Sequence, residues 1–224
     1  MKAGSKKSKK GQSVVEFSFI VIALMLLVMG TIELGGAASL SLRIASAVYE
    51  AGRIINTEAL WPSASNTTAQ NSTFLQSGLS SNIYPAVKNM ILPADITNNG
   101  TVIFTYLTRV AKDTNAANDQ LQLTYQWYFS GSSVSTSAPS SYVASKVPYS
   151  MVGSGTSAVK VVNSSFFDMN ALLTSQSTVV VEIYHKTNPL MAKFTGILSQ
   201  AQKTYSSNNT QVTSMNYIYD FAIY

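Results

Sequence analysis

The chain has 224 residues, of which 46% are hydrophobic, only 11% are charged and none is cysteine. This length suits one membrane segment plus a single domain, and the lack of cysteine excludes disulfides, thiolate catalysis and cysteine-ligated zinc. The net charge of +5 does not indicate nucleic-acid binding, because five of the fifteen basic residues lie within the first ten positions and the remainder balance the acidic residues. The basic cluster is instead typical of a targeting segment.

An uncharged apolar run from Phe17 to Ile32 follows the lysine cluster. Together with its apolar neighbours, over residues 15–34, it is long enough to cross a bilayer as a helix. The lysines ahead of the run place the N-terminus in the cytoplasm and the chain after about residue 35 outside, by the positive-inside rule. We therefore predict a single-pass precursor in the cytoplasmic membrane.

The helix is expected to continue beyond the membrane, so that residues 12–60 form one rod of roughly 70 Å. Apolar residues recur at helical spacing on one face of its upper half: Leu40, Ile44, Ala47, Val48, Ala51, Ile54 and Ile55. Polar residues occupy the opposite face: Arg43, Ser46, Glu50 and Arg53. Glu50 and Arg53 are spaced for an ion pair, and Trp61 with Pro62 ends the element.

Three interpretations of this N-terminal region compete. The basic start, the apolar run and the small residues Gly35, Gly36 and Ala37 resemble a cleavable secretory signal. A plain membrane anchor explains the length of the run. Neither accounts for Glu16 and Glu33 at its two ends, because carboxylates are costly near hydrocarbon unless they are neutralised or paired.

The third interpretation is a processing site after Gly11. The stretch Gly-Gln-Ser-Val-Val-Glu-Phe that begins there resembles the type IV prepilin site, in which a peptidase cuts after glycine and glutamate is the fifth mature residue. A cut there removes all the clustered lysines and leaves an α-amino group at Gln12 near the carboxylate of Glu16. In type IV pilins that glutamate is thought to meet the amine of a neighbouring subunit, so that each charge offsets the desolvation of the other.

The resemblance narrows to the TadE-type pilins of tight-adherence (Flp) systems. Members carry a GQ-x-x-VEF start, a long apolar stretch, a second glutamate in a G-x-x-E-F/L-G context, and an A-x-x-x-G-A/R-R-like segment. The matching residues are Gly11, Gln12, Val15, Glu16, Phe17, Gly30, Glu33, Leu34, Gly35, Ala47, Ala51, Gly52 and Arg53. The proline that many relatives place early in the apolar stretch is missing here, which predicts a straighter helix.

This resemblance implies a structural pilin subunit rather than an enzyme. Gly11 would precede the cut, Gln12 would become the N-terminus, and Glu16 would be the recognition or register carboxylate. Helix contacts during assembly would involve these residues: Glu16, Phe17, Glu33 and Arg53. For Glu33 a second interpretation stays open, that of an interfacial residue at the outer end of the span, where hydration is cheap.

The partners implied are other pilin subunits, a prepilin peptidase and an inner-membrane assembly platform, with no nucleic acid. After processing, the protein is expected outside the cytoplasmic membrane, in a surface pilus that serves adhesion. The alternative function is an extracytoplasmic binding or adhesion domain on an uncleaved anchor or a conventional signal peptide, with no pilus role.

Residues 61–224 are predicted to form one α+β domain with a mainly antiparallel four-stranded sheet that covers the upper half of the rod, as in pilins. The predicted strands are Thr101–Val110, Leu121–Phe129, Thr178–Lys186 and Gln211–Tyr219. In the second of these, strict alternation of apolar and polar residues predicts one buried face and one wet face.

Helices are predicted at residues 82–91, from Ser164 or Ser165 to Leu173, and at residues 189–203. Polar composition predicts a loop over residues 62–73. Residues 130–157 are rich in Ser, Gly and Pro, and we expect them to be an exposed excursion.

No pattern in the sequence indicates a catalytic site or a cofactor. His185, the single histidine, is expected to be a strand-edge side chain. Asp113, Asn115 and Asp119 resemble a fragment of a calcium loop, but their spacing fits no complete loop, so we favour a turn. Tyrosines near the C-terminus are candidates for an adhesive patch, although core packing is the favoured role: Tyr217, Tyr219 and Tyr224.

Overall fold

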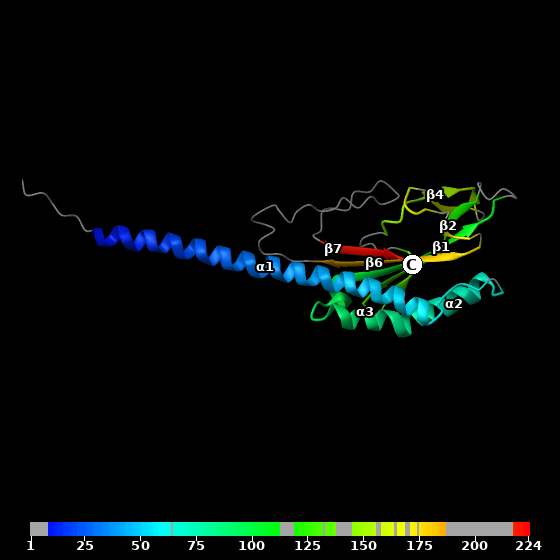
Figure 1. Cartoon of the computed structure of the whole chain (residues 1–224), viewed down its shortest axis with the longest axis horizontal. Coiled ribbons are helices and arrows are strands. Elements are labelled where there is room, and N and C mark those ends of the chain that lie inside the picture. The colour runs from blue at the N-terminus through cyan, green and yellow to red at the C-terminus, as the bar shows by residue number, and fades with distance from the viewer. Residues whose placement is uncertain are drawn as a thin grey trace, which may run out of the picture.

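A computed structural model describes residues 9–63, 65–112, 119–131, 133–137, 145–155, 158–163, 165–168, 171–173, 175–186 and 217–224. Its first element, α1 (Lys9–Thr57), is a single helix of 49 residues, roughly 73 Å long at 1.5 Å per residue. The N-terminal half of α1 projects away from the molecule, and the C-terminal half lies along the domain (Figure 1). The predicted long helix is therefore confirmed.

Three shorter helices and one π-helical turn follow α1 and lie beside its C-terminal half (Figure 1). They are α2 (Thr68–Gly78), η1 (Leu79–Ile83), α3 (Tyr84–Ile91) and α4 (Ile96–Asn99). The helix predicted at residues 82–91 is confirmed, but the loop predicted for residues 62–73 is wrong from Thr68 onward. Thr67 accepts a hydrogen bond from the backbone N–H of Gln70, whose side chain accepts one from the N–H of Thr67. This capping box starts a helix within a polar stretch.

The domain is built on a seven-stranded antiparallel sheet rather than the four strands predicted. The strands are β1 (Gly100–Val110), β2 (Gln120–Ser130), β3 (Ser133–Ser135), β4 (Tyr149–Val152), β5 (Val159–Val162), β6 (Ser177–Lys186) and β7 (Tyr217–Ile223). Their order is β4-β5-β2-β1-β6-β7, with β3 also paired to β2. The three additional strands, β3 to β5, have three or four residues each, too few to show a clear alternation.

The strand predicted at residues 211–219 is displaced toward the C-terminus. β7 begins at Tyr217 and runs to Ile223, paired with β6 along its length. The earlier part of the predicted range lies outside the described residues, as does the helix predicted at residues 189–203. Of the described residues in the helix predicted to end at Leu173, none is α-helical.

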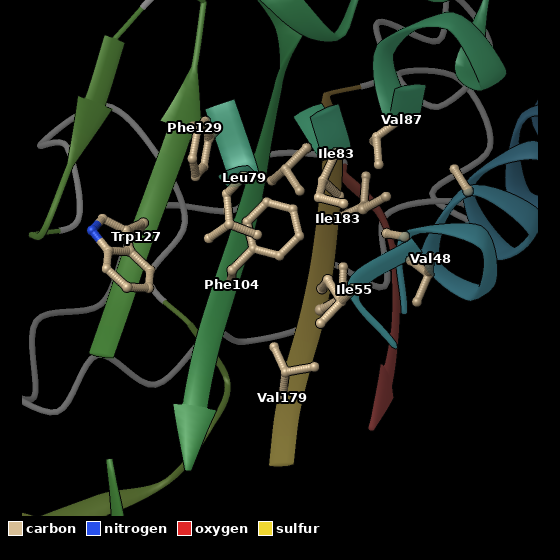
Figure 2. Packing of buried hydrophobic residues seen from close by; sticks show 14 of the residues in the cluster. Val48, Ile55, Leu79, Ile83, Val87, Phe104, Trp127, Phe129, Val179 and Ile183 are labelled. Atoms are coloured by element: carbon tan, nitrogen blue, oxygen red, sulfur yellow. The ribbon is translucent and has the colours of Figure 1, made fainter. Parts of the chain in front are cut away.

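The long strands of the sheet are buried on both faces, which corrects the expectation of one wet face. A β-bulge decides which residues of β2 lie on each face. The register of β1 and β2 shifts between Tyr106, which faces Tyr125, and Leu107, which faces Leu123. On one side of the shift, Tyr125, Trp127 and Phe129 of β2 pack in the core with α1 and its neighbouring helices (Figure 2). On the other side Leu121 and Leu123 join a separate cluster with Leu107. An extra residue in one strand reverses which side chains face the helix.

The second cluster is covered in part by the segment expected to be an exposed excursion. Val147, in this segment, is buried against Leu107 and Val180 of the sheet. Two strands of the segment, β3 and β4, also join the sheet edge. The expectation of an exposed excursion is therefore confirmed only in part: many described residues of the segment are exposed, but Val147 returns the chain to the sheet.

Candidate assembly and processing site

The N-terminal half of α1 carries exposed apolar side chains on every side. Phe19 is 70% exposed and Ile32 is 69% exposed. The remaining large exposed hydrophobic residues of this half are Val14, Val15, Phe17, Ile20, Ile22, Leu24, Met25, Leu26, Leu27, Val28, Met29 and Leu34. A helix that is apolar all round is stable only where lipid or other protein covers it. This half of α1 therefore requires an environment other than water.

A lipid bilayer fits the dimensions of this segment. Among the described residues, one helix, over residues 13–57, is long and apolar enough to cross a membrane by its length and composition. Glu16 and Glu33 stand 17 positions apart in it, which corresponds to about 26 Å along a helix axis. This distance approaches the roughly 30 Å hydrocarbon thickness of a bilayer. In a helix that spans a bilayer, the two carboxylates would therefore lie near the two interfaces.

The predicted processing residues lie in the first turns of α1. Gly11 and Gln12 belong to the helix, and the side chain of Gln12 lies outside the described part of the chain. Glu16 and Phe17 follow and are exposed, whereas Glu33 is half-buried. The structure thus aligns these residues along one rod.

The C-terminal half of α1 is amphipathic and packs on the domain, as the spacing of its apolar residues predicts. Ile44, Ala47, Val48, Ala51 and Ile55 are all buried in the main core. They face aromatic and aliphatic residues of the sheet and of the shorter helices (Figure 2). The domain consequently holds α1 by one face along several helical turns.

The predicted ion pair on the opposite face is also present. The Nε atom of Arg53 donates to Oε2 of Glu50 at 2.7 Å, and a second contact joins Nη2 to Oε1. The hydrogen bond from Arg53 lowers the pKa of the Glu50 carboxyl. Because Arg53 is exposed, this pair forms part of the surface that α1 presents outward from the domain.

Gly52, on the domain-facing side, is where the C-terminus meets the rod. A β-carbon at Gly52 would lie 2.0 Å from the ring of Tyr224. The Tyr224 hydroxyl donates to the carbonyl oxygen of Val48 at 3.0 Å, and its backbone pairs with Val179 of β6. Burial raises the pKa of Tyr224 to about 12. The absence of a side chain at Gly52 therefore lets the last residue fasten the sheet to α1.

Glu182, a fully buried carboxylate in β6, was not among the predicted site residues. It accepts hydrogen bonds from the backbone N–H of Lys146 at 2.8 Å and from the hydroxyls of Tyr184 and Tyr219 at 3.2 Å each. The Ser145 hydroxyl also donates to it. Burial raises the pKa of Glu182, and these hydrogen bonds offset only part of that effect.

These contacts show that Glu182 joins three segments that are distant in the sequence. Ser145 and Lys146 belong to the segment that follows β3, while Tyr219 belongs to β7. The Lys146 ammonium lies 3.6 Å from the centroid of the Tyr219 ring, a favourable cation–π geometry. In the sequence, the feature that could have indicated this cluster is the isolated carboxylate in the apolar run Val-Val-Val-Glu-Ile-Tyr. Among the C-terminal tyrosines, Tyr219 and Tyr224 pack within the domain, which is the role favoured from the sequence. The side chain of Tyr217 lies outside the described residues.

His185 and the calcium candidates take structural positions. His185 is buried in β6 between β1 and β7, so the expectation of a strand-edge side chain is wrong. Asp119 accepts a 2.8 Å hydrogen bond from Nε of Arg109, and both side chains are nearly buried. Asp113 and Asn115 lie outside the described residues. No group of three possible His, Asp or Glu metal ligands occurs in the part of the chain that the structure describes.

The chain thus combines a folded α+β domain with an exposed apolar helix that is long enough to cross a membrane. Residues 11–53 match the model of the family described as TadE-like protein. The N-terminal segment of this protein is therefore TadE-like, as its resemblance predicts. The match begins at Gly11, ends at Arg53, and includes both Glu16 and Glu33. Comparisons with curated proteins and with solved structures gave no match.

Proposed function

We propose that this protein is a TadE-like pseudopilin or minor pilin, a structural subunit that assembles through α1 into a surface pilus of the tight-adherence type. One observation carries the proposal. The half of α1 that is apolar on every side is a direct continuation of the half that packs on the domain. One helix thus supplies a membrane anchor in the precursor and a core segment in a filament.

The proposed processing step is a cut after Gly11 by a prepilin peptidase. It removes the lysine cluster and leaves Gln12 as a new N-terminus, four positions before Glu16. On a helix, positions four apart lie on the same face. The new amine and the carboxylate therefore lie together at the cytoplasmic end, where the amine of one subunit is available to the Glu16 carboxylate of the next.

In the proposed pathway the precursor sits in the cytoplasmic membrane with its N-terminus inside. After processing, the helix leaves the bilayer at an inner-membrane assembly platform and packs against other pilin helices. Phe17, Glu33 and Arg53 are the further residues proposed to contact neighbouring helices. The domain then faces outward, where it supports adhesion.

The deciding experiment determines the N-terminus of the mature protein by mass spectrometry in cells with and without the peptidase. We expect Gln12 at the N-terminus, and we expect Gly11→Leu to abolish the cut. Gly4→Leu is the matched control, because it places the same side chain in the basic segment away from the bond, and it should be processed normally. An N-terminus near Ala38 would indicate a secretory signal, and an intact Met1 would indicate a binding domain on a plain anchor.

Assembly is tested separately with Glu16→Ala. This variant should insert in the membrane normally but yield few surface filaments, counted by electron microscopy. Ser18→Ala is the matched control, since the Ser18 hydroxyl donates only to the carbonyl of Val14 within its own helix. Normal filaments from Glu16→Ala would rule out the pairing of amine and carboxylate.

A further inference from the structure

We propose that a groove beside β2 binds a saccharide. The groove has a volume of about 440 Å³ and lies among α2, the end of β3 and the start of β5. Its floor is formed by residues 122–127 of β2, and its walls include Ser72, Thr136 and Lys160. This volume falls within the range of about 300–1,000 Å³ that small-ligand sites occupy.

The groove results from the way two short strands meet β2. β3 pairs with β2 at residues 128–130, while β5 pairs with it at Gln122. The bulge, where Thr124 is the extra residue of β2 between Leu123 and Tyr125, lies between these two points. A bulge bends and twists its strand, so the flanking strands diverge along the middle of β2. The hollow is therefore built into the sheet topology.

One buried donor at the groove has no partner. The indole Nε1 of Trp127 is buried and makes no hydrogen bond, and Trp127 as a whole is only 1% exposed. Its ring stacks on Tyr125 at 5.5 Å with an interplanar angle of 5°, and it meets Tyr106 edge-on at 5.9 Å. Figure 2 shows the indole nitrogen pointing past β2, away from β1 and the packed core. The two neighbouring rings hold the N–H in that direction, where a ligand oxygen would satisfy it.

The chemistry of the lining favours a saccharide. The hydroxyl groups of Ser72 and Thr136 and the amide of Gln122 can each donate and accept hydrogen bonds, as sugar hydroxyls do. The Thr124 hydroxyl donates to Thr108 at 2.8 Å and can accept a further hydrogen bond. The lining residues include no carboxylate, and the one charged group is Lys160, so a neutral or anionic sugar fits better than a cation. Val159 supplies an apolar wall for the C–H face of a sugar ring. An extended peptide would instead depend on main-chain pairing with β2.

The groove is placed where an external ligand can reach it. α2, which contributes Ser72, lies at the end of the molecule opposite the free N-terminal half of α1 (Figure 1). If α1 is anchored in a membrane, this end faces outward. The inference rests on the domain alone, so it can fail while the proposed pilus function stands, and the reverse also holds.

The test measures binding of the full-length protein in detergent to an array of neutral and sialylated oligosaccharides, with extended β-forming peptides printed beside them. We expect binding to at least one oligosaccharide and none to the peptides. Gln122→Ala and Trp127→Phe should each weaken that binding at least tenfold. Gln76→Ala is the matched control, because Gln76 is an exposed residue of α2 outside the groove lining, and its binding should equal that of the wild type.

Circular dichroism melts of each variant separate loss of binding from loss of folding. If Trp127→Phe does not fold, Gln122→Ala alone decides the outcome. Absence of oligosaccharide binding by the folded wild type overturns the proposal, as does unchanged binding by folded Gln122→Ala. Binding to the peptides alone also overturns it and indicates strand addition to β2 instead.

Discussion

The two halves of α1 belong to one continuous helix, but their apolar side chains are shielded from water in different ways. In the C-terminal half, apolar side chains occur on one face and are buried by the domain. In the N-terminal half they occur on every face and are covered by nothing in the described chain. One half is therefore stabilised within the chain, while the other depends on lipid or on other protein to cover it.

Gly35, Gly36 and Gly52 of α1 differ in the same way in their contacts with the rest of the chain. A β-carbon at Gly52 would overlap the ring of Tyr224, whereas a β-carbon at Gly35 or Gly36 would meet no atom within 4 Å. Of these three glycines, packing inside the chain requires only Gly52. Any requirement for small residues at Gly35 and Gly36 must come from outside the chain.

The largest expected effect is the loss of core packing in the C-terminal half. Ile55 is fully buried, so Ile55→Ala should lower the free energy of unfolding of the domain by about 2–5 kcal/mol. Ile22→Ala is the matched control in the exposed half and should change it by less than about 0.5 kcal/mol. Urea unfolding in detergent, followed by tryptophan fluorescence, measures both. Equal losses in the two variants would mean that the halves are not energetically separate.

The second effect concerns the contact between Gly52 and Tyr224. Gly52→Leu should lower the free energy of unfolding by about 1–3 kcal/mol because the new side chain displaces the tyrosine ring. Gly36→Leu provides the control and should leave the domain unchanged. In a Tyr224→Ala background the cost of Gly52→Leu should shrink, which a double-mutant cycle measures. If Gly52→Leu lowers the free energy of unfolding equally with and without the Tyr224 ring, the loss does not come from the contact between Gly52 and Tyr224.

A third prediction uses the pH dependence of Glu182. Its pKa is raised above the ordinary value of 4.5 in the folded state, so folding takes up a proton. The contribution of Glu182 to stability is greatest below pH 4.5 and is lost as the pH rises through the folded pKa, by up to about 1.4 kcal/mol per pH unit. Glu182→Gln lacks this titration, so its stability relative to the wild type should increase with pH.

Urea unfolding between pH 4 and pH 8 tests this prediction. Glu58→Gln serves as the control, since it removes an exposed carboxylate and should follow the wild-type profile. Parallel profiles for Glu182→Gln and the wild type would show that Glu182 is not responsible. The neighbouring titratable groups, Lys146, Tyr184 and Tyr219, remain in every variant.

The smallest effect on stability is expected at Arg53. Its pair with Glu50 is exposed, and exposed ion pairs contribute little because water and salt screen them. Arg53→Ala should therefore leave the melting temperature of the domain unchanged. If Arg53 contacts a neighbouring helix in the filament, as proposed, the same variant should reduce the number of filaments. If Arg53→Ala keeps both the melting temperature and the number of filaments, Arg53 does not belong to the assembly surface.

Much of the fold was predictable from local patterns. The length of α1, its buried face and the Glu50 to Arg53 pair follow from helical spacing alone. β1, β2 and β6 were predicted within one residue of their observed bounds, because each is ten or eleven residues long with β-favouring composition. The start of α2 was missed although Thr67 and Gln70 form a recognisable capping box, because the surrounding polar composition was read as a loop.

The features that were missed depend on contacts between distant segments. A bulge in β2 between Leu123 and Tyr125 decides which residues of β2 face the helix. The alternation of apolar and polar residues within β2 does not indicate where this bulge lies. Similarly, β7 pairs with β6 at His185 and encloses it. The pattern of β6 alone does not indicate this second neighbour, so His185 was expected at a strand edge.

The sequence by itself determined the rod, its apolar half and the Gly11 to Glu16 motif, because helical periodicity and charge placement are local properties. The tertiary structure alone decided that Glu182 joins three segments, that Tyr224 rests on Gly52, and that β3 and β5 leave a groove beside Trp127. These features arise where residues far apart in the chain meet, and their energies depend on burial and register that no local pattern contains.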